Sequence, residues 1–291
     1  MKTISALLAT CLFSALQATA EILPLRLEVP PEGEPALSEP LLFWTQSRSD
    51  PVPVDLFIVR IDLKHPELEL ATFIADDPDD AGPAESKLLD PLDLAGRHNA
   101  LAAVNANAFG ALPEDTTRGY ILGMPVQIMG FAATEGVHRS GVYEHKGNDL
   151  AFWLDPEGRP HVGPTPDKAE AVKLGVNAWW GDLVAGGEIL PQPGGDRHPR
   201  TAVGFDAEGR WLYLVVADGR RPGQSEGMTL HELAETMLEL GTARAINLDG
   251  GGSSVMLLAS GDGLEVLNRP SGGSLRPVPV MLGVRAARSD E

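Results

Sequence analysis

The chain has 291 residues, 43% of them hydrophobic, so it is long enough to bury the core of one large domain or of two small ones. Its formal net charge of −18 argues against nonspecific binding of nucleic acid, which needs a basic surface. Beyond the N-terminal segment, no stretch reaches the roughly 20 apolar residues that a transmembrane helix needs.

The N-terminal segment is typical of a secretory signal peptide. Lys2 supplies a positive charge, Ile4–Leu16 an apolar region, and Ala18–Ala20 the small residues of a cleavage site. We expect residues 1–20 to be removed, and with them Cys11, the only cysteine. The mature protein would then lack disulfides, thiolate metal sites and cysteine nucleophiles, and would lie in the periplasm or outside the cell.

The mature chain is predicted to begin with a proline-rich, irregular lead-in over residues 21–53, followed by a domain over residues 54–287. Alternating apolar residues predict strands at Asp55–Leu63 and Leu68–Ala75, paired through a turn near Lys64–Glu67.

A short helix and a buried strand are predicted next. Asp90 has the character of an N-cap, and Pro91 that of a first helical residue, so a helix should run toward His98. Leu101–Val104 then predicts a buried strand that leads into Asn105.

A hairpin and a second helix follow. Ala202–Phe205 and Trp211–Ala217 predict antiparallel strands around a turn. Thr229 and Glu232 have the spacing of a capping box, which predicts a helix to about Leu240. This helix is interpreted as scaffold that delivers the chain into the next strand.

The most informative stretch follows the apolar run Ala243–Leu248. It reads Asp249-Gly250-Gly251-Gly252-Ser253-Ser254, and three glycines in a row suit a loop that passes very close to a ligand or to other backbone. An ordinary tight turn is the alternative.

The strand Trp211–Ala217 also ends in Asp218-Gly219. If the two strands lie side by side and parallel, Asp218 and Asp249 emerge at the same sheet edge. The fold class expected from these elements is α+β, a single domain with a large mixed or antiparallel sheet flanked by few helices.

Further motifs lie in order between Asn105 and Val284. They are Asn105 with Phe109, His198–Gly204, Asp218–Arg220, Ser225–Gly227, the helix after Thr229, Ala245–Ser254, Asn268–Ser271 and Arg276–Val278. In this order and spacing the chain resembles the phosphodiester glycosidase family.

The resemblance implies hydrolysis of a sugar-1-phosphodiester at its glycosidic bond, with release of free sugar and a phosphomonoester. An oxocarbenium-like transition state calls for a carboxylate near the anomeric carbon. Asp249 is the first candidate, as nucleophile or as base for water, with Asp218 or Glu226 as its partner. Because the leaving phosphate has a second pKa of about 6, a strong general acid is dispensable. The candidate substrate-binding residues are Asn105, Arg200, Thr201, Arg220, Asn247, Gly250, Gly251, Gly252, Ser253, Ser254 and Arg276.

Other sites and functions stay open at this stage. No metal is required, although Asp218 and Asp249 could bind Ca²⁺ or Mg²⁺ through oxygen ligands. The expected partner is a small glycan or a glycan-phosphate polymer. The main rival to the enzyme is a glycan- or cell-wall-binding module without catalysis, in which Trp179 and Trp180 stack on sugar, although adjacent tryptophans more often belong to a core.

Overall fold

Antiparallel sheets build the computed structural model, which describes residues 39–80, 82–112, 119–140, 149–166, 171–261 and 263–288. Seven strands form the first sheet, in the order β1 (Leu41–Arg48), β2 (Val54–Asp62), β16 (Trp211–Ala217), β15 (Arg200–Phe205), β17 (Arg244–Asn247), β13 (Asp182–Ala185) and β14 (Glu188–Ile189). Five form the second, in the order β19 (Gly263–Val266), β18 (Met256–Ser260), β5 (Ala100–Asn105), β20 (Val280–Ala286) and β3 (Leu68–Ile74).

Two further sheets complete the described structure. One has the order β11 (Pro160–Pro164), β10 (Leu150–Leu154), β12 (Leu174–Asn177), β8 (Ala132–Thr134) and β9 (Val137–Ser140). The other is small and has the order β4 (Ser86–Lys87), β7 (Pro125–Ile128) and β6 (Phe109–Ala111). Each strand pair within the described residues is antiparallel. The fold is therefore mainly sheet, with fewer helical residues than an α+β class implies.

The main hydrophobic core lies where the three larger sheets meet, and it collects residues from strands of each. Strand β16 shows how alternation divides its side chains. Leu214 and Val216 point into this core, whereas Val215 and Ala217 belong to a second cluster on the opposite face of the sheet. Apolar residues occupy both faces of the strand because both faces are covered.

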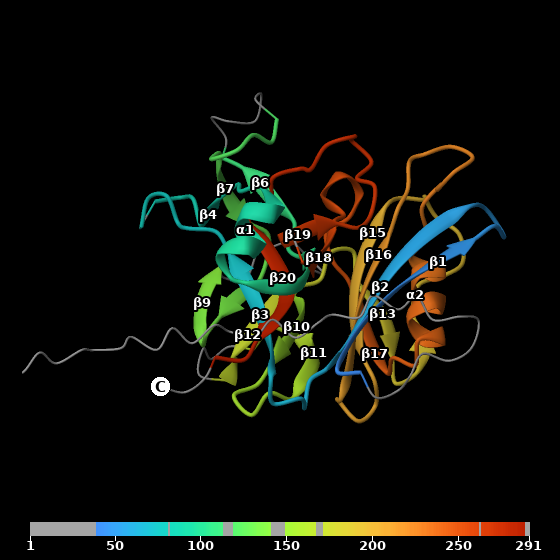
Figure 1. Cartoon of the computed structure of the whole chain (residues 1–291), viewed down its shortest axis with the longest axis horizontal. Helices are drawn as coiled ribbons and strands as arrows, with labels where there is room; N and C mark the ends of the chain where they lie inside the picture. The colour runs from blue at the N-terminus through green and yellow to red at the C-terminus, as the bar shows by residue number, and fades with distance from the viewer. Residues whose placement is uncertain are drawn as a thin grey trace, which may run out of the picture.

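Two helices cover the outer faces of the sheets (Figure 1). Helix α2 (Leu230–Glu239) packs on the first sheet, with Leu233 and Met237 fully buried, and the predicted capping box of Thr229 and Glu232 is confirmed. Helix α1 (Pro91–Arg97) packs on the second sheet through Leu94, and Asp90 caps it as predicted. None of the described helices is long and apolar enough to cross a membrane.

Three expectations about the sheets need correction. The strands predicted to pair, β2 and β3, belong to different sheets, because the turn after β2 carries the chain from the first sheet to the second. Part of the predicted irregular lead-in, Leu41–Arg48, forms the edge strand β1 between two groups of prolines. The predicted signal peptide and the rest of the lead-in to residue 38 lie outside the described residues.

The third correction concerns the two strands that end in Asp-Gly. Both β16 and β17 pair antiparallel with β15, so they run in the same direction but β15 lies between them. Their carboxyl ends still reach the same edge of the first sheet, with Arg200 at the start of β15 between Asp218 and Asp249. The predicted hairpin of β15 and β16 is confirmed.

Candidate active site

Asp249 lies on the segment that carries the chain from the first sheet to the second. Strand β17 ends at Asn247, a short 3₁₀ turn, η3, spans Gly251–Ser253, and β18 begins at Met256. The turn lies against the start of β15: the Gly251 N–H donates to the Pro199 carbonyl at 2.8 Å. A Cβ on Gly250 would come within 2.8 Å of that carbonyl oxygen, so this approach of backbone to backbone requires glycine.

A cleft of about 260 Å³ opens over this segment. It is lined by Trp179, Trp180, His198, Arg200, Arg220, Asn247, Asp249, Gly250, Gly251, Gly252 and Arg276. The structure therefore brings together seven of the predicted site residues around Asp249: three arginines, Asn247 and the three glycines. Among the lining residues that the structure describes, Asp249 is the one carboxylate.

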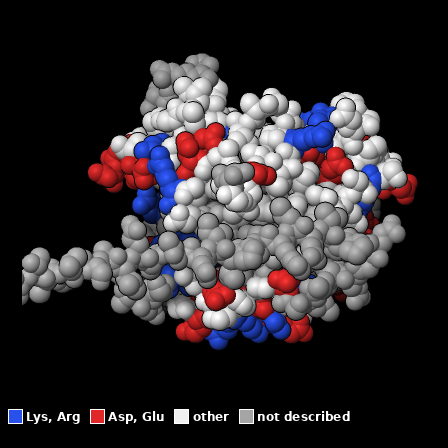
Figure 2. Space-filling view, in the orientation of Figure 1, with Lys and Arg blue, Asp and Glu red and all other residues white. Residues whose placement is uncertain are grey.

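Three arginines bring positive charge to this cleft. In the described part of the chain, none of Arg200, Arg220 and Arg276 has a carboxylate within ion-pair distance. Elsewhere charges of both signs are interspersed, as on the face drawn in Figure 2. Burial lowers the pKa of Arg200, and the positive charge of Arg220 adds to this effect. Like charges held this close together favour the binding of an anion.

The glycines of the turn make room for two of these guanidinium groups. A Cβ on Gly251 would lie 3.0 Å from Nη2 of Arg220, and a Cβ on Gly252 would lie 2.3 Å from Nη2 of Arg276. Arg220 itself has φ of 59°, in the left-handed region that costs energy for a residue with a side chain. Both guanidinium groups thus lie directly against the backbone beside Asp249.

The Asp249 carboxyl is perturbed by its surroundings. Burial raises its pKa to about 6, against the opposing effects of a hydrogen bond with the Ser253 side chain, the positive charge of Arg276 and the Gly250 N–H. The Gly250 N–H donates to Oδ1 of Asp249 at 3.0 Å. Near neutral pH the carboxylate is therefore mostly ionised yet more basic than an ordinary aspartate, which suits a nucleophile or a general base.

His198 lines the same cleft, and its Nδ1 lies 3.5 Å from Nη2 of Arg220. Burial lowers its pKa, and the charges of Arg200 and Arg220 lower it further against the opposing charge of Asp196, so these surroundings favour the neutral ring. A neutral imidazole here adds hydrogen-bonding capacity without another charge.

Two predicted site residues form buried hydrogen bonds that hold the main chain of Asp249. Asn105, at the end of β5, donates from Nδ2 to the Asp249 carbonyl, and its Oδ1 accepts from the Thr201 hydroxyl at 2.8 Å and from the Val255 N–H at 3.1 Å. Asn105 and Thr201 are both buried and neither lines the cleft. In this structure Asn105 thus contacts the main chain around Asp249, Thr201 contacts Asn105, and neither side chain faces the cleft.

Asn247 holds the two tryptophans at the cleft. Its carbonyl accepts from the Trp179 N–H at 2.8 Å, its N–H donates to the Gly181 carbonyl at 3.2 Å, and its Nδ2 donates to the Trp179 carbonyl at 2.5 Å. Trp180 lies between Trp179 and Gly181 in the chain, has a φ of 63° and is 71% exposed. The expectation that the paired tryptophans belong to the core is therefore wrong for Trp180.

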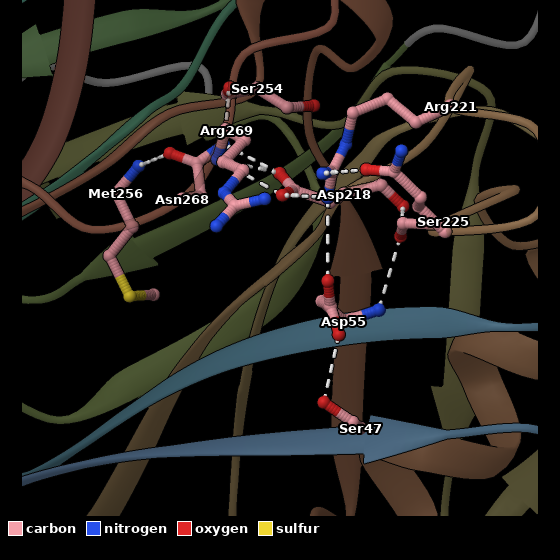
Figure 3. Close-up of polar contacts among 10 residues, drawn as sticks. Ser47, Asp55, Asp218, Arg221, Ser225, Ser254, Met256, Asn268 and Arg269 are labelled. Atoms are coloured by element: carbon pink, nitrogen blue, oxygen red, sulfur yellow. Dashed lines mark hydrogen bonds and ion pairs between the residues drawn. The ribbon is translucent and has the colours of Figure 1, made fainter.

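Asp218 is buried in a different network (Figure 3). It accepts from Nδ2 of Asn268 at 3.0 Å, from the Arg269 N–H at 3.0 and 3.1 Å, and from Nη2 of Arg221 at 2.9 Å. Burial raises its pKa, against these donors. Because Asn268 also donates to the Ser254 carbonyl at 3.1 Å, this network supports the end of the glycine turn.

The remaining candidates also lie apart from the cleft lining. Glu226 accepts from the Gly223 N–H at 2.7 Å within its own turn, and Ser254 is buried. Ser253 is buried as well, but its side chain forms a hydrogen bond with the Asp249 carboxyl, and its hydroxyl accepts from Nη1 of Arg276 at 3.4 Å. The described residues contain no group of three or more His, Cys, Asp or Glu side chains arranged to hold a metal ion.

Comparison with known proteins places this site in a family. Over 59 residues the chain is 48% identical to mouse and 46% identical to human N-acetylglucosamine-1-phosphodiester alpha-N-acetylglucosaminidase. These matches cover 20% of this chain and 11% of the length of each relative.

Solved structures share the fold. The catalytic domain of the zebrafish N-acetylglucosamine-1-phosphodiester alpha-N-acetylglucosaminidase, auto-inhibited by its pro-peptide, superposes with a TM-score of 0.61 at 21% identity, covering 86% of this chain and 85% of that one. A hypothetical protein from Synechocystis also gives 0.61, at 17% identity, covering 87% of this chain and 65% of that one.

A family model for phosphodiester glycosidases matches residues 98–285, which include each residue of the cleft lining. The chain belongs to the phosphodiester glycosidase family.

Proposed function

We propose that the protein is an exported hydrolase that cleaves the glycosidic bond of sugar-1-phosphodiesters and releases free sugar and a phosphomonoester. One observation carries the proposal: a single carboxylate with a raised pKa, Asp249, lies among three arginines that have no carboxylate partners in the described residues. A phosphodiester needs positive charge, and the anomeric carbon needs an anionic or basic group beside it.

The single carboxylate fits the chemistry of the leaving group. When the bond between the anomeric carbon and the phosphate oxygen breaks, the electron pair stays on the phosphate, which leaves as a monoester with a second pKa of about 6. It can therefore depart without receiving a proton in the transition state. The guanidinium groups of Arg220 and Arg276 would stabilise the charge that grows on its oxygens.

Asp249 has two roles open to it. As a nucleophile it would form a glycosyl ester that water then hydrolyses, and the sugar would keep its anomeric configuration. As a base it would take a proton from a water that attacks the anomeric carbon, and the configuration would invert. In both cases the ionised carboxylate is the reactive form.

A glycan-binding module without catalysis is the second candidate, and the exposure of Trp180 favours it. An aromatic ring at the mouth of a polar cleft is a common platform for sugar binding. Such a module would bind sugar phosphates in the same cleft but would not need the carboxylate of Asp249. The two candidates therefore differ in what the variant Asp249→Asn does.

The experiment is proton NMR of the purified protein with a panel of sugar-1-phosphate methyl diesters, including that of N-acetylglucosamine. We expect the wild type to release free sugar and Asp249→Asn to release none while binding the diester with similar affinity. The first anomer that appears distinguishes retention from inversion. Binding without turnover by the wild type would overturn the enzymatic proposal and support the binding module.

A further inference from the structure

Arg276 reaches the cleft from the segment between β19 and β20, and its side chain is half-buried. Its Nη1 donates to the Ser253 hydroxyl at 3.4 Å, which is a long hydrogen bond. An arginine side chain has many rotamers and loses their entropy when a ligand fixes it in one of them. An arginine that binds an anion therefore gains affinity from any contact that already fixes its guanidinium group.

Tyr120 supplies such a contact. The Cζ atom of Arg276 lies over the Tyr120 ring, 5.1 Å from the ring centroid, which is inside the roughly 6 Å reach of a cation–π interaction. Tyr120 does not itself line the cleft. Unlike a carboxylate partner, the ring attracts the guanidinium without neutralising its charge, so Arg276 stays available to an anion.

The Tyr120 ring is in turn held against the hydrophobic core. It packs edge-on against Phe109, the first residue of β6, with 4.9 Å between the ring centroids and 67° between the ring planes. Phe109 is buried in the cluster on which helix α1 packs. It is also the aromatic residue of the motif that begins at Asn105. Tyr120 thus connects this part of the core to a charged group of the cleft.

The main chain after Tyr120 is anchored as well. The Met124 N–H donates to the Ile121 carbonyl at 3.2 Å, and the Gly123 N–H donates to the Leu88 carbonyl at 2.8 Å. Met124 is buried in the same cluster as Phe109. Tyr120 remains 43% exposed although its neighbours are fixed, so burial of its own surface does not explain its position.

We propose that Tyr120 is a positioning residue, which holds the Arg276 guanidinium toward the cleft so that it binds the phosphate of the substrate. The inference rests on the proposed function, in which Arg276 binds that phosphate. The guanidinium lies against the glycine turn, where a Cβ on Gly252 would come within 2.3 Å of Nη2, and the Tyr120 ring is its second neighbour. The orientation is then fixed when the protein folds, and ligand binding does not have to fix it again.

The test measures the affinity of the purified full chain for methyl phosphate by phosphorus NMR titration. Tyr120→Leu keeps an apolar side chain against Phe109 but removes the aromatic face. It should weaken binding about two- to fivefold, the effect of a cation–π contact at a partly exposed site. Tyr120→Phe keeps the aromatic face and should restore the wild-type affinity. The matched control is Leu122→Ala, an exposed apolar residue of the same segment outside the cleft lining, which should leave the affinity unchanged.

A double-mutant cycle shows whether Tyr120 acts through Arg276. In the Arg276→Gln background, Tyr120→Leu should cause no further loss of affinity, because the cation that the ring contacts is absent. Arg200 and Arg220 remain in the cleft of this background and keep it positively charged. An equal loss in both backgrounds would overturn the inference, and so would a Tyr120→Phe variant as weak as Tyr120→Leu. Thermal melting of each variant checks that the losses do not arise from unfolding.

The outcomes separate this inference from the proposed function. Equal affinity of Tyr120→Leu and the wild type would overturn the positioning role even if the wild type hydrolyses diesters. A loss that depends on Arg276 supports the role even if no diester is hydrolysed, in which case only the catalytic proposal fails. A wild type that does not bind methyl phosphate would overturn the phosphate contact of Arg276 and this inference with it, whereas release of free sugar tests catalysis at Asp249 separately.

Discussion

Asn105 donates a hydrogen bond of 2.6 Å from Nδ2 to the main-chain carbonyl of Asp249, which lies 144 residues further along the chain. The same side chain accepts from the Thr201 hydroxyl and the Val255 N–H. One amide therefore ties β5, β15 and the end of the glycine turn together at the residue that we propose to be catalytic. The position of Asp249 depends on all three.

Removing this amide should affect both stability and turnover. We expect Asn105→Ala to lower the free energy of unfolding by about 1 to 3 kcal/mol, since it leaves buried donors and acceptors without partners. Turnover should fall roughly 10- to 100-fold, because small displacements of a catalytic group are costly. Thr201→Val removes only one of the three bonds and should have a smaller effect on both. Urea unfolding and diester turnover measure these quantities, and full activity in Asn105→Ala would contradict the positioning role.

The pH dependence of kcat/KM should follow the ionisation of Asp249. Since the ionised carboxylate is the reactive form and its pKa is raised to about 6, activity should rise with pH through this value and level off above it. A profile that falls as pH rises through 6 would instead assign Asp249 the role of an acid.

Arg276 should influence that profile. Its positive charge lowers the pKa of Asp249, so Arg276→Gln should move the rising limb to higher pH. The same variant should raise KM, because the guanidinium is proposed to bind the phosphate. Arg269→Gln is the control, since Arg269 contacts Asp218 through its backbone and does not line the cleft. An unchanged limb in Arg276→Gln would exclude this electrostatic coupling.

The raised pKa of Asp249 also predicts how stability changes with pH. The unfolded carboxyl ionises near its ordinary pKa of about 4, so between about pH 4 and 6 the folded protein holds a proton that the unfolded chain has released. Stability due to this group is therefore present at low pH and is lost as pH rises through 6. Asp249→Asn should be more stable than the wild type at pH 8, by at most about 3 kcal/mol, and nearly equal at pH 4. Thermal unfolding at both pH values tests this, and a difference independent of pH would contradict it.

Gly252 provides a test of the close approach between the turn and Arg276. A methyl group at this position would meet Nη2 at 2.3 Å, so Gly252→Ala should displace the guanidinium and raise KM about tenfold or more, the effect of losing roughly 1.4 kcal/mol of charge-assisted binding. Gly261→Ala is the matched control, because a Cβ at Gly261 has nothing within 4 Å. Equal kinetics in the two variants would show that Arg276 does not need this position.

Asp218 and Glu226 were the predicted partners of Asp249, and the structure gives a way to test both. In Asp218→Asn the new Nδ2 would face N–H donors of its neighbours, so unfolding free energy should fall by about 1 to 3 kcal/mol while the pH profile keeps its shape. Glu226→Gln should change neither property by much, because Glu226 accepts one hydrogen bond within its own turn. If either variant lost the rising or the falling part of the pH profile, the substituted residue would be a catalytic acid or base.

The amino-acid sequence alone was enough to predict several local elements and to single out the segment around Asp249. The Thr229 capping box, the Asp90 N-cap and the β15–β16 hairpin depend on residues close together in the chain, and all three are confirmed. The glycine turn after Asp249 was also predicted, because three consecutive glycines favour a loop that passes very close to a ligand or to other backbone.

Which of the candidate side chains face a common cleft became clear only from the folded chain, because the residues that line this cleft come from segments far apart in the sequence. Asp218 and Asp249 follow strands of the same direction with the same Asp-Gly signal, but β15 separates them and Asn268 and Arg221 surround the first. Trp180 is exposed at the cleft, whereas Asn105 is buried and absent from the cleft lining. Burial and the raised pKa of Asp249 arise from contacts between residues that are distant in the chain, and a local sequence pattern does not reveal such contacts.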